Sequence, residues 1–477
     1  MAAVLRWNEV APRVRLSAVS LPVVLVTTLL YALGLIDSLV LVGHAALVLY
    51  LLAEWPRLPR TNQALLWAAV GAALLLPALV AEPLPVLRQA FDRAAYYATF
   101  MTALAFLREA AITSPLVRRC GHLILNQPPA KRYLTLSGGA ALFGIILNIG
   151  SLNLLGVMTM RGNTLRAAGG NPEIQRTRRR RMTQALLRGF GLTPLVSPFS
   201  ITLVVVLSNI PGLQWYQVLP LGYLLAGLLL WFGWWFDRRT APRHLAGLAP
   251  ALDRQVRWWP LVQFVALVLA IVGVAVGLEL LLTIPLVLAI LLTAPLAGLV
   301  WLAVQRDRHG PVRAMRYAGV RLGRRAVHLF PSLRSEVGIL GGAGFVGVLL
   351  SAMLPPQLVA DALGALHLTG PLIAVLMLAI VLLASHVGIN PIISVSLLAS
   401  ALPDPVSLGL APAVLGAAFM AAWALAVSSS PMTASVLLLA RLAEVSPSTI
   451  GYRWNGIYTA GGFLLLTSAL LVLGYLL

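Results

Sequence analysis

The sequence predicts an all-α polytopic membrane protein, with about 11 transmembrane helices and two re-entrant hairpins in an inverted repeat. Hydrophobic residues make up 59% of the chain and charged residues only 10%, and the mean hydropathy is +0.89. Many apolar stretches reach the roughly 20 residues that cross a bilayer as a helix. In each half of the chain, two of these stretches are interrupted by Gly, Pro and small polar residues.

The first four spans are predicted at residues 17–35, 37–54, 63–81 and 95–113. The first apolar run is followed closely by another and lacks a small-residue cleavage pattern, so we expect a retained span rather than a signal peptide. Positively charged loops favour the cytoplasmic side of a membrane. Such residues precede the first span, separate the second from the third and follow the fourth: Arg6, Arg13, Arg15, Arg57, Arg60, Arg118 and Arg119. The N-terminus is therefore predicted to lie inside.

The first re-entrant hairpin is predicted at residues 133–160, which are interrupted between Asn148 and Asn153. Lys131 and Arg132 precede this stretch, and residues 161–188, which follow it, are rich in arginine. Both flanks are expected to be cytoplasmic. A stretch that is inside at both ends and polar in its middle is predicted to enter the membrane and return.

The second hairpin is predicted at residues 371–402, interrupted between Ser385 and Pro391. Its flanks, residues 354–370 and 403–412, contain no Lys or Arg, so both are expected to be external. Basic flanks on one copy and none on the other are what an inverted repeat predicts.

The remaining spans are predicted at residues 183–207, 218–236, 260–277, 281–304, 336–353, 413–440 and 456–477, with basic inside loops at 238–257 and 306–334. The C-terminus is then outside, in a bacterial-type cytoplasmic (inner) membrane. Four segments are predicted: N-terminal scaffold helices at 1–94, a first repeat at 95–237, a basic linker with scaffold helices at 238–335, and a second repeat at 336–477.

Charge and residue usage argue against other classes of protein. The net charge of +20 comes from arginines in short loops without interleaved aromatic residues, so we expect a lipid bilayer as partner and no nucleic acid. The single cysteine, Cys120, excludes an internal disulfide framework. No carboxylate lies at the centre of a predicted span, and no paired histidines or G-x-S-x-G motif occur. We therefore predict no enzyme activity; a lipid or polymer exporter on the same scaffold stays open.

The interrupted stretches carry the candidate binding chemistry. Pro198 and Pro431 each remove a backbone donor and disfavour helix at the preceding serine, which frees carbonyl oxygens for a cation such as Na⁺. Helix N-termini after each interruption favour an anion. The predicted substrate- or ion-binding residues are Asn148, Gly150, Ser151, Asn153, Ser197, Pro198, Ser200, Thr202, Ser385, His386, Gly388, Asn390, Pro391, Ser428, Ser429, Ser430, Pro431 and Thr433, with Na⁺ expected near Ser151, Asn153, Ser197, Asn390 and Ser430 and no other cofactor.

Other roles are open for several of these residues. Serines in membrane helices commonly bond to the carbonyl one turn earlier, and we expect this of Ser394, Ser396 and Ser400. Gly150 and Gly388 could instead allow close helix packing. His386, at a hairpin tip, could couple protons, contact substrate or form a structural hydrogen bond.

The combination of a re-entrant hairpin and a broken helix in each half resembles the ion transporter superfamily, and within it the divalent anion:sodium symporter family. That family carries Ser-Asn-Thr at each hairpin tip. Here the tips read Gly150-Ser151-Leu152-Asn153 and Gly388-Ile389-Asn390-Pro391, a departure from that pattern, whereas the interruptions at 193–198 and 428–433 match better. The resemblance implies a homodimeric secondary transporter of a small anion (di- or tricarboxylate-like, or sulfate- or sulfonate-like) with Na⁺ coupling and elevator-type alternating access. Coupling to H⁺ is the alternative.

Overall fold

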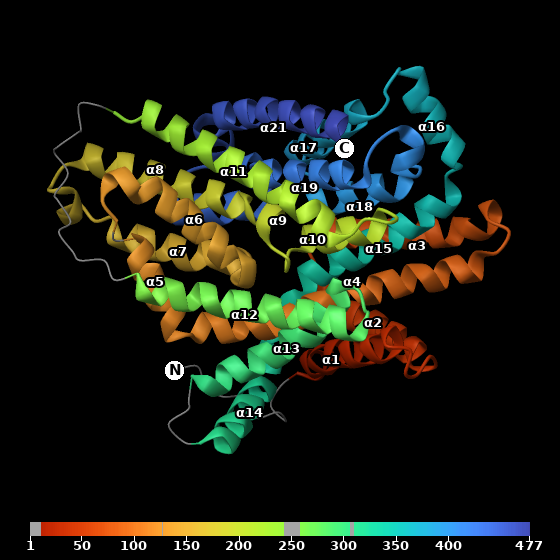
Figure 1. Ribbon diagram of the computed structural model, residues 1–477. Coiled ribbons are helices and arrows are strands. Elements are labelled where there is room, and N and C mark those ends of the chain that lie inside the picture. The colour runs from red at the N-terminus through yellow and green to blue at the C-terminus, as the bar shows by residue number, and fades with distance from the viewer. Residues whose placement is uncertain (1–10, 126, 243–257, 306–309) are drawn as a thin grey trace. The chain divides into compact units, whose positions relative to one another are not determined.

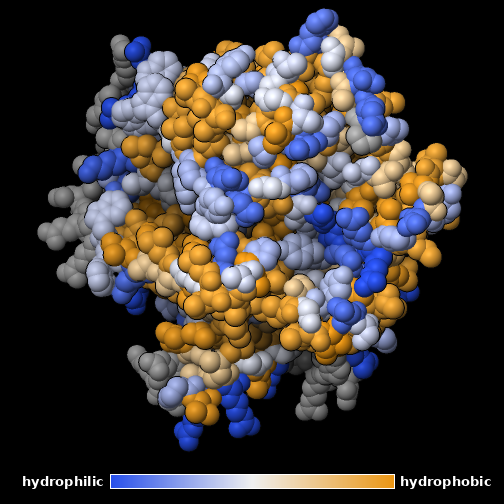
Figure 2. Space-filling model, turned by 45° about the vertical axis from the view of Figure 1, so that its right-hand side comes forward, coloured by the Kyte–Doolittle hydropathy of each residue, from blue (hydrophilic) through white to orange (hydrophobic). Residues whose placement is uncertain are grey.

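The computed structural model describes residues 11–125, 127–242, 258–305 and 310–477, and the secondary structure in these ranges is helical throughout (Figure 1). Within these described ranges, ten helices are long and apolar enough to cross a membrane, or eleven if α4 (Pro83–Thr113) and α5 (Pro115–Leu125) form one bent span. On the face drawn in Figure 2, hydrophobic residues cover much of the surface. The predicted class is confirmed: the chain is an all-α, multi-pass membrane protein.

The chain divides into two compact units. The first unit comprises Met1–Ser114, Leu269–Val359 and Ser396–Leu402, and the second comprises Pro115–Val268, Ala360–Val395 and Pro403–Leu477. The four-segment division expected from the sequence stays a prediction. Most of its basic linker, residues 243–257, lies outside the described residues.

Helix α4 is the centre of the first unit. Its alanines Ala94, Ala98 and Ala103 are buried and let neighbouring helices approach closely. A Cβ atom on Gly298 of α13 would lie 2.7 Å from the Phe106 backbone, so glycine is required there. The other helices of this unit are α1 (Pro12–Ala32), α2 (Leu39–Glu54), α3 (Arg60–Leu79), α13 (Leu286–Val304), α14 (Pro311–Leu329) and α15 (Arg334–Met353).

Helix α19 (Pro412–Ser429) is the centre of the second unit, and it is buried on nearly every side. It packs against α8, α9, α10, α11, α17 and α21. This unit also contains α5, α6 (Pro129–Leu147), α7 (Ile149–Gly162), α8 (Pro172–Gly191), α9 (Thr193–Val196), α10 (Ile201–Asn209), α11 (Trp215–Arg239), α17 (Pro371–His386), α20 (Ala434–Ala443), the π-helix η8 (Thr449–Trp454) and α21 (Gly456–Leu476). Helices α12 (Trp259–Leu282), α16 (Pro356–Ala365) and α18 (Pro391–Ala401) are divided between the units.

Every predicted span overlaps one helix or, at 183–207 and 413–440, a helix broken into pieces, but some polar segments differ from expectation. Helix α4 begins at Pro83, so Asp92 lies within the helix, where it pairs with His44 of α2 at 2.8 Å. The basic flank at 161–188 and the basic loop at 306–334 were expected as connecting segments, yet α8 and α14 occupy much of them. A hydropathy search finds apolar runs. It does not find an amphipathic helix that carries arginines on one face.

The first predicted interruption is confirmed as a turn between two packed helices, whereas re-entry of this pair from the cytoplasmic side stays a prediction. Helices α6 and α7 join at Asn148, whose φ of 49° lies in the left-handed region, and they pack against each other and against α8. The interruption of the second hairpin is confirmed as well, because α17 ends at His386 and α18 begins at Pro391. Since α18 is divided between the units, the return of the chain after this interruption stays a prediction.

The opposed orientation of the two repeats is testable by cysteine labelling. Ala167 and Ser407 are both exposed, whereas the native Cys120 is buried. We expect a cysteine at Ala167 to react with an impermeant maleimide only from the cytoplasm, and one at Ser407 only from outside. The nearby Asn171 is less suitable for labelling, because its side chain caps α8 by accepting from the Glu173 and Ile174 amides. Labelling of both positions from one side would contradict the inverted repeat.

Candidate functional site

The first helix break lies between α9 and α10, at Ser197 to Ser200. The Ser200 hydroxyl caps α10 by accepting from the Leu203 amide at 3.1 Å. The hydroxyl groups of Ser197 and Thr193 are buried and have no hydrogen-bond partner among the described residues. A buried hydroxyl without a partner is costly, so two polar atoms at this break are available to a ligand. Pro198 and Thr202 are buried alongside.

The second helix break lies between α19 and α20, at Ser430 to Thr433. The buried Ser430 hydroxyl donates to the Ser385 carbonyl at 2.6 Å and accepts from the Met432 amide at 3.2 Å. The hydroxyl of Thr433 donates to the Ser430 carbonyl at 2.7 Å. The tip of α17 is thus bonded to the second break, which brings two of the predicted segments together.

The two breaks belong to neighbouring helices of the second unit. A Cβ atom on Gly191, at the end of α8, would lie 3.0 Å from both the Ala424 carbonyl oxygen and the Ser428 Cβ of α19. Glycine therefore permits α8 and α19 to approach closely just before their respective breaks. Pro431 is buried beside the second break. Ser428 and Ser429 donate to carbonyls of α19 one turn earlier, which leaves only their lone pairs for a ligand.

The tip of the first hairpin is more open. Asn148 and Asn153 are exposed, while Ser151 is buried and its hydroxyl donates to the Asn148 carbonyl at 2.7 Å. A Cβ atom on Gly150 would make only an ordinary 3.8 Å contact with Leu147, so close packing does not require glycine there. The two asparagine side chains therefore remain accessible at this tip.

The tip of the second hairpin needs its glycine for backbone conformation. Gly388 has a φ of 98°, which side chains disfavour. The Asn390 side chain accepts from the Ile392 amide at 2.9 Å and so caps α18, whose first residue is the buried Pro391. The expectation that Ser394 and Ser396 bond to the preceding turn is wrong, since both hydroxyls are buried and neither has a partner within the described ranges.

His386 forms a structural hydrogen bond, one of the roles left open for it, and also a ring contact that the sequence did not indicate. Its Nδ1 lies 2.8 Å from the Leu382 carbonyl oxygen, and because a carbonyl only accepts, Nδ1 carries the proton. The ring stacks on Tyr452 of η8, with centroids 5.7 Å apart. Gly451, beside it, lies so close to Pro431 that a Cβ atom would be 2.9 Å from its Cγ. A π-helix, a conformation frequent at functional sites, therefore packs directly on the second break.

Arg188 of α8 is a buried cation near the breaks that sequence reasoning missed. It is 3% exposed, its Nε donates to Asn455 at 2.9 Å, and its guanidinium lies 4.3 Å from the Tyr458 ring centroid. Its Nη2 has no hydrogen-bond partner in the part of the chain that the structure describes. A buried cation that pairs with an amide and an aromatic face instead of a carboxylate is electrostatically suited to an anion. The sequence signal that could have identified this residue is the position of an arginine inside a predicted span.

The described residues contain no group of three or more His, Cys, Asp or Glu side chains that could hold a metal ion. A cation bound at the breaks would therefore be held by hydroxyl and carbonyl oxygens, which are ligands for hard cations.

No family model matches the chain, and no curated protein matches it. The crystal structure of the YdaH transporter of Alcanivorax borkumensis, described as having an unusual topology, is similar with a TM-score of 0.53 and 16% sequence identity, over 86% of this chain and 98% of that one. This similarity shows a shared fold. The MtrF structure of Neisseria gonorrhoeae, described within a class of antimetabolite efflux pumps, has a TM-score of 0.46 and 13% identity, over 83% of this chain and 85% of that one.

Proposed function

We propose that the chain is a secondary active transporter of a small anion, of di- or tricarboxylate-like or sulfate- or sulfonate-like chemistry, coupled to Na⁺. The observation that carries the proposal is the pair of broken helices, α8–α10 and α19–α20, which meet at Gly191 and Ser428 within one unit. Irregular backbone within a membrane is tolerated where it is buried in protein or lines a cavity. Paired interruptions of this kind are typical of transporter binding sites.

The anion is supported by two sources of positive potential. Helices α10 and α20 begin directly after the breaks, and helix N-termini attract anions. Arg188 adds a buried full charge on α8, the helix that leads to the first break. The similarity to a structure described as a transporter is consistent with this function.

Na⁺ is supported by the ligand chemistry at the first break. The unpartnered hydroxyls of Ser197 and Thr193 are neutral oxygen donors, and no carboxylate is among the predicted site residues to carry a proton. The division into two units, with both breaks in the second, supports an elevator-type mechanism in which that unit moves its substrate as one body. Membership of the divalent anion:sodium symporter family and a homodimeric state are parts of this proposal.

H⁺ coupling is the second candidate, and His386 favours it. With Nδ1 donating to Leu382, Nε2 is left as the acceptor that a transported proton would occupy. His386 is partly exposed and lies beside Ser385, the residue bonded to the second break.

A thermal-shift screen of the purified protein against dicarboxylates, tricarboxylates, sulfonates and sulfate, with and without Na⁺, identifies the substrate class. Transport assays with the best ligand then distinguish Na⁺ coupling from H⁺ coupling. We expect uptake of the best ligand into proteoliposomes to require a Na⁺ gradient and to persist in His386→Gln. Uptake that follows a pH gradient, ignores Na⁺ and is abolished by His386→Gln would reject Na⁺ coupling. Stabilisation by none of these anions would reject the proposed substrate class.

A further inference from the structure

Helix α14 must lie at the membrane boundary. It connects α13 and α15, which are both long and apolar enough to span, whereas α14 is not among the helices that could cross. Its sequence contains five arginines and no carboxylate, so it cannot return the chain to the opposite side, and the end of α13 and the start of α15 share one side. A connecting helix of this kind is held close to the lipid headgroups.

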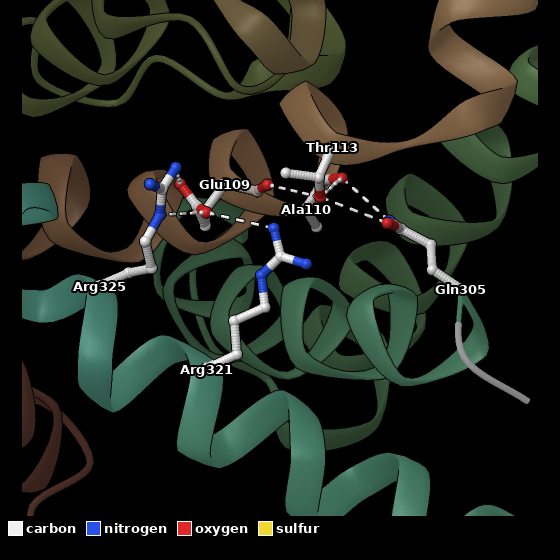
Figure 3. Close-up of polar contacts among 6 residues, drawn as sticks. All are labelled: Glu109, Ala110, Thr113, Gln305, Arg321 and Arg325. Atoms are coloured by element: carbon white, nitrogen blue, oxygen red, sulfur yellow. Dashed lines mark hydrogen bonds and ion pairs between the residues drawn. The ribbon is translucent and has the colours of Figure 1, made fainter. Parts of the chain in front are cut away.

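The contacts of α14 within the first unit determine which face of this helix is buried and which is exposed. Ala314, Ala318 and Leu322 form its buried face, and the helix packs on α13 and α1. Figure 3 shows Arg321 and Arg325 reaching Glu109 of α4, at 3.7 Å and 2.9 Å from its Oε1. Glu109 is itself 4% exposed, so this ion pair is a firm anchor.

In the same view Gln305, at the end of α13, donates to the Ala110 carbonyl at 2.9 Å and lies 3.3 Å from the Thr113 hydroxyl. The end of α13 that leads into α14 is therefore tied to the same turn of α4 that holds the arginines. These polar contacts fix both the segment that leads into α14 and the second half of α14 itself against α4.

The remaining arginines point the other way. Arg313, Arg316 and Arg324 are exposed, and at helical spacing they share the face opposite the buried alanines. Val320, which is 47% exposed, lies between them on that face, and Val312, which is 81% exposed, lies at its edge. Three cations interspersed with two apolar side chains match the boundary between lipid headgroups and acyl chains.

We propose that this face of α14, defined by Val312, Arg313, Arg316, Val320 and Arg324, binds the phosphates of anionic lipids in the adjacent leaflet. Charge complementarity carries the proposal: α14 has no acidic side chain, and the acidic partner that two of its arginines use, Glu109, lies on the other side of the helix. Guanidinium groups donate to phosphate oxygens in a bidentate manner, while the valines contact the upper acyl region. The proposal is independent of what the protein transports.

The test measures lipid binding directly, by native mass spectrometry of the full-length protein titrated with phosphatidylglycerol or phosphatidylcholine. We expect the wild type to prefer phosphatidylglycerol. Each arginine near an anionic surface contributes roughly a fivefold gain in binding, so Arg316→Gln should lose about fivefold and the triple variant R313Q/R316Q/R324Q about a hundredfold. The charge-preserving triple variant R313K/R316K/R324K should retain most of the binding.

The matched control is R118Q/R166Q/R176Q, which removes equal charge from exposed positions elsewhere and should retain wild-type binding. An equal loss in the control would mean that net charge alone attracts the lipid, and would overturn the site. Unchanged binding in Arg316→Gln and in the glutamine triple would also overturn it. Efficient competition by inorganic phosphate at millimolar concentration would assign the face to soluble anions instead.

Discussion

Ser197→Ala is expected to leave the ligand-free protein as stable as the wild type while weakening cation or substrate binding about tenfold to hundredfold. The Ser197 hydroxyl is fully buried and has no partner, so its removal relieves an unsatisfied polar group. A hydrogen bond to a charged ligand is worth about 1.5–3 kcal/mol, which corresponds to that loss of affinity. The measurement is the thermal stabilisation of purified protein by Na⁺, followed by transport.

Ser430→Ala should behave differently, although the two serines occupy corresponding breaks. The Ser430 hydroxyl bonds to the Ser385 carbonyl and the Met432 amide, and its loss leaves two backbone groups without this partner. We expect the ligand-free protein to lose about 1–3 kcal/mol of stability. Ser468→Ala is the control, because this exposed serine bonds only to the carbonyl one turn earlier in α21.

A drop in ligand-free stability in Ser197→Ala, or undiminished Na⁺ stabilisation together with wild-type transport, would show that the first break is structural.

The asparagines at the hairpin tips can be tested in the same way, by comparing ligand-free stability with ligand binding. Asn153→Ala should weaken binding without a stability cost because the side chain is exposed, whereas Asn390→Ala also removes the cap of α18.

Asp237→Asn is expected to destabilise the protein by about 3 kcal/mol, since it leaves the Arg181 cation without its charged partner. Arg181 of α8 bonds to both carboxylate oxygens of Asp237 on α11, at 3.0 and 2.5 Å. Asp237 is 7% exposed, whereas the Arg181 side chain is 33% exposed, so the effect should lie at the lower end for buried ion pairs. Denaturant or thermal unfolding in detergent measures it.

The double variant Arg181→Gln/Asp237→Asn should recover part of this loss, because neither charge then remains unpaired. Asp361→Asn, at an exposed position of α16, should have little effect on stability. Equal stability of Asp237→Asn and Asp361→Asn would mean that α8 and α11 are held by apolar packing alone.

Much of the architecture could be predicted from local sequence. Spans follow from apolar length, and the breaks at Ser197 and Ser430 follow from Pro198 and Pro431, because a proline acts on its own backbone and on the residue before it. The same local logic failed for α14 and the start of α8, where arginine-rich segments form helices. It also failed for Ser394 and Ser396, whose hydroxyls do not bond to their own helix.

The sequence by itself determined the membrane class, the order of the spans and the positions of both helix breaks. Only the tertiary structure decided which polar atoms at those breaks are available to bind a ligand. The Ser430 hydroxyl is occupied because α17 brings the Ser385 carbonyl to it, whereas the Ser197 hydroxyl meets no partner. Arg188 finds Asn455 and Tyr458, which are far away along the chain. Hydropathy and proline effects act over one or two helical turns, but a polar atom buried in a membrane protein is satisfied by whichever distant segment packs against it.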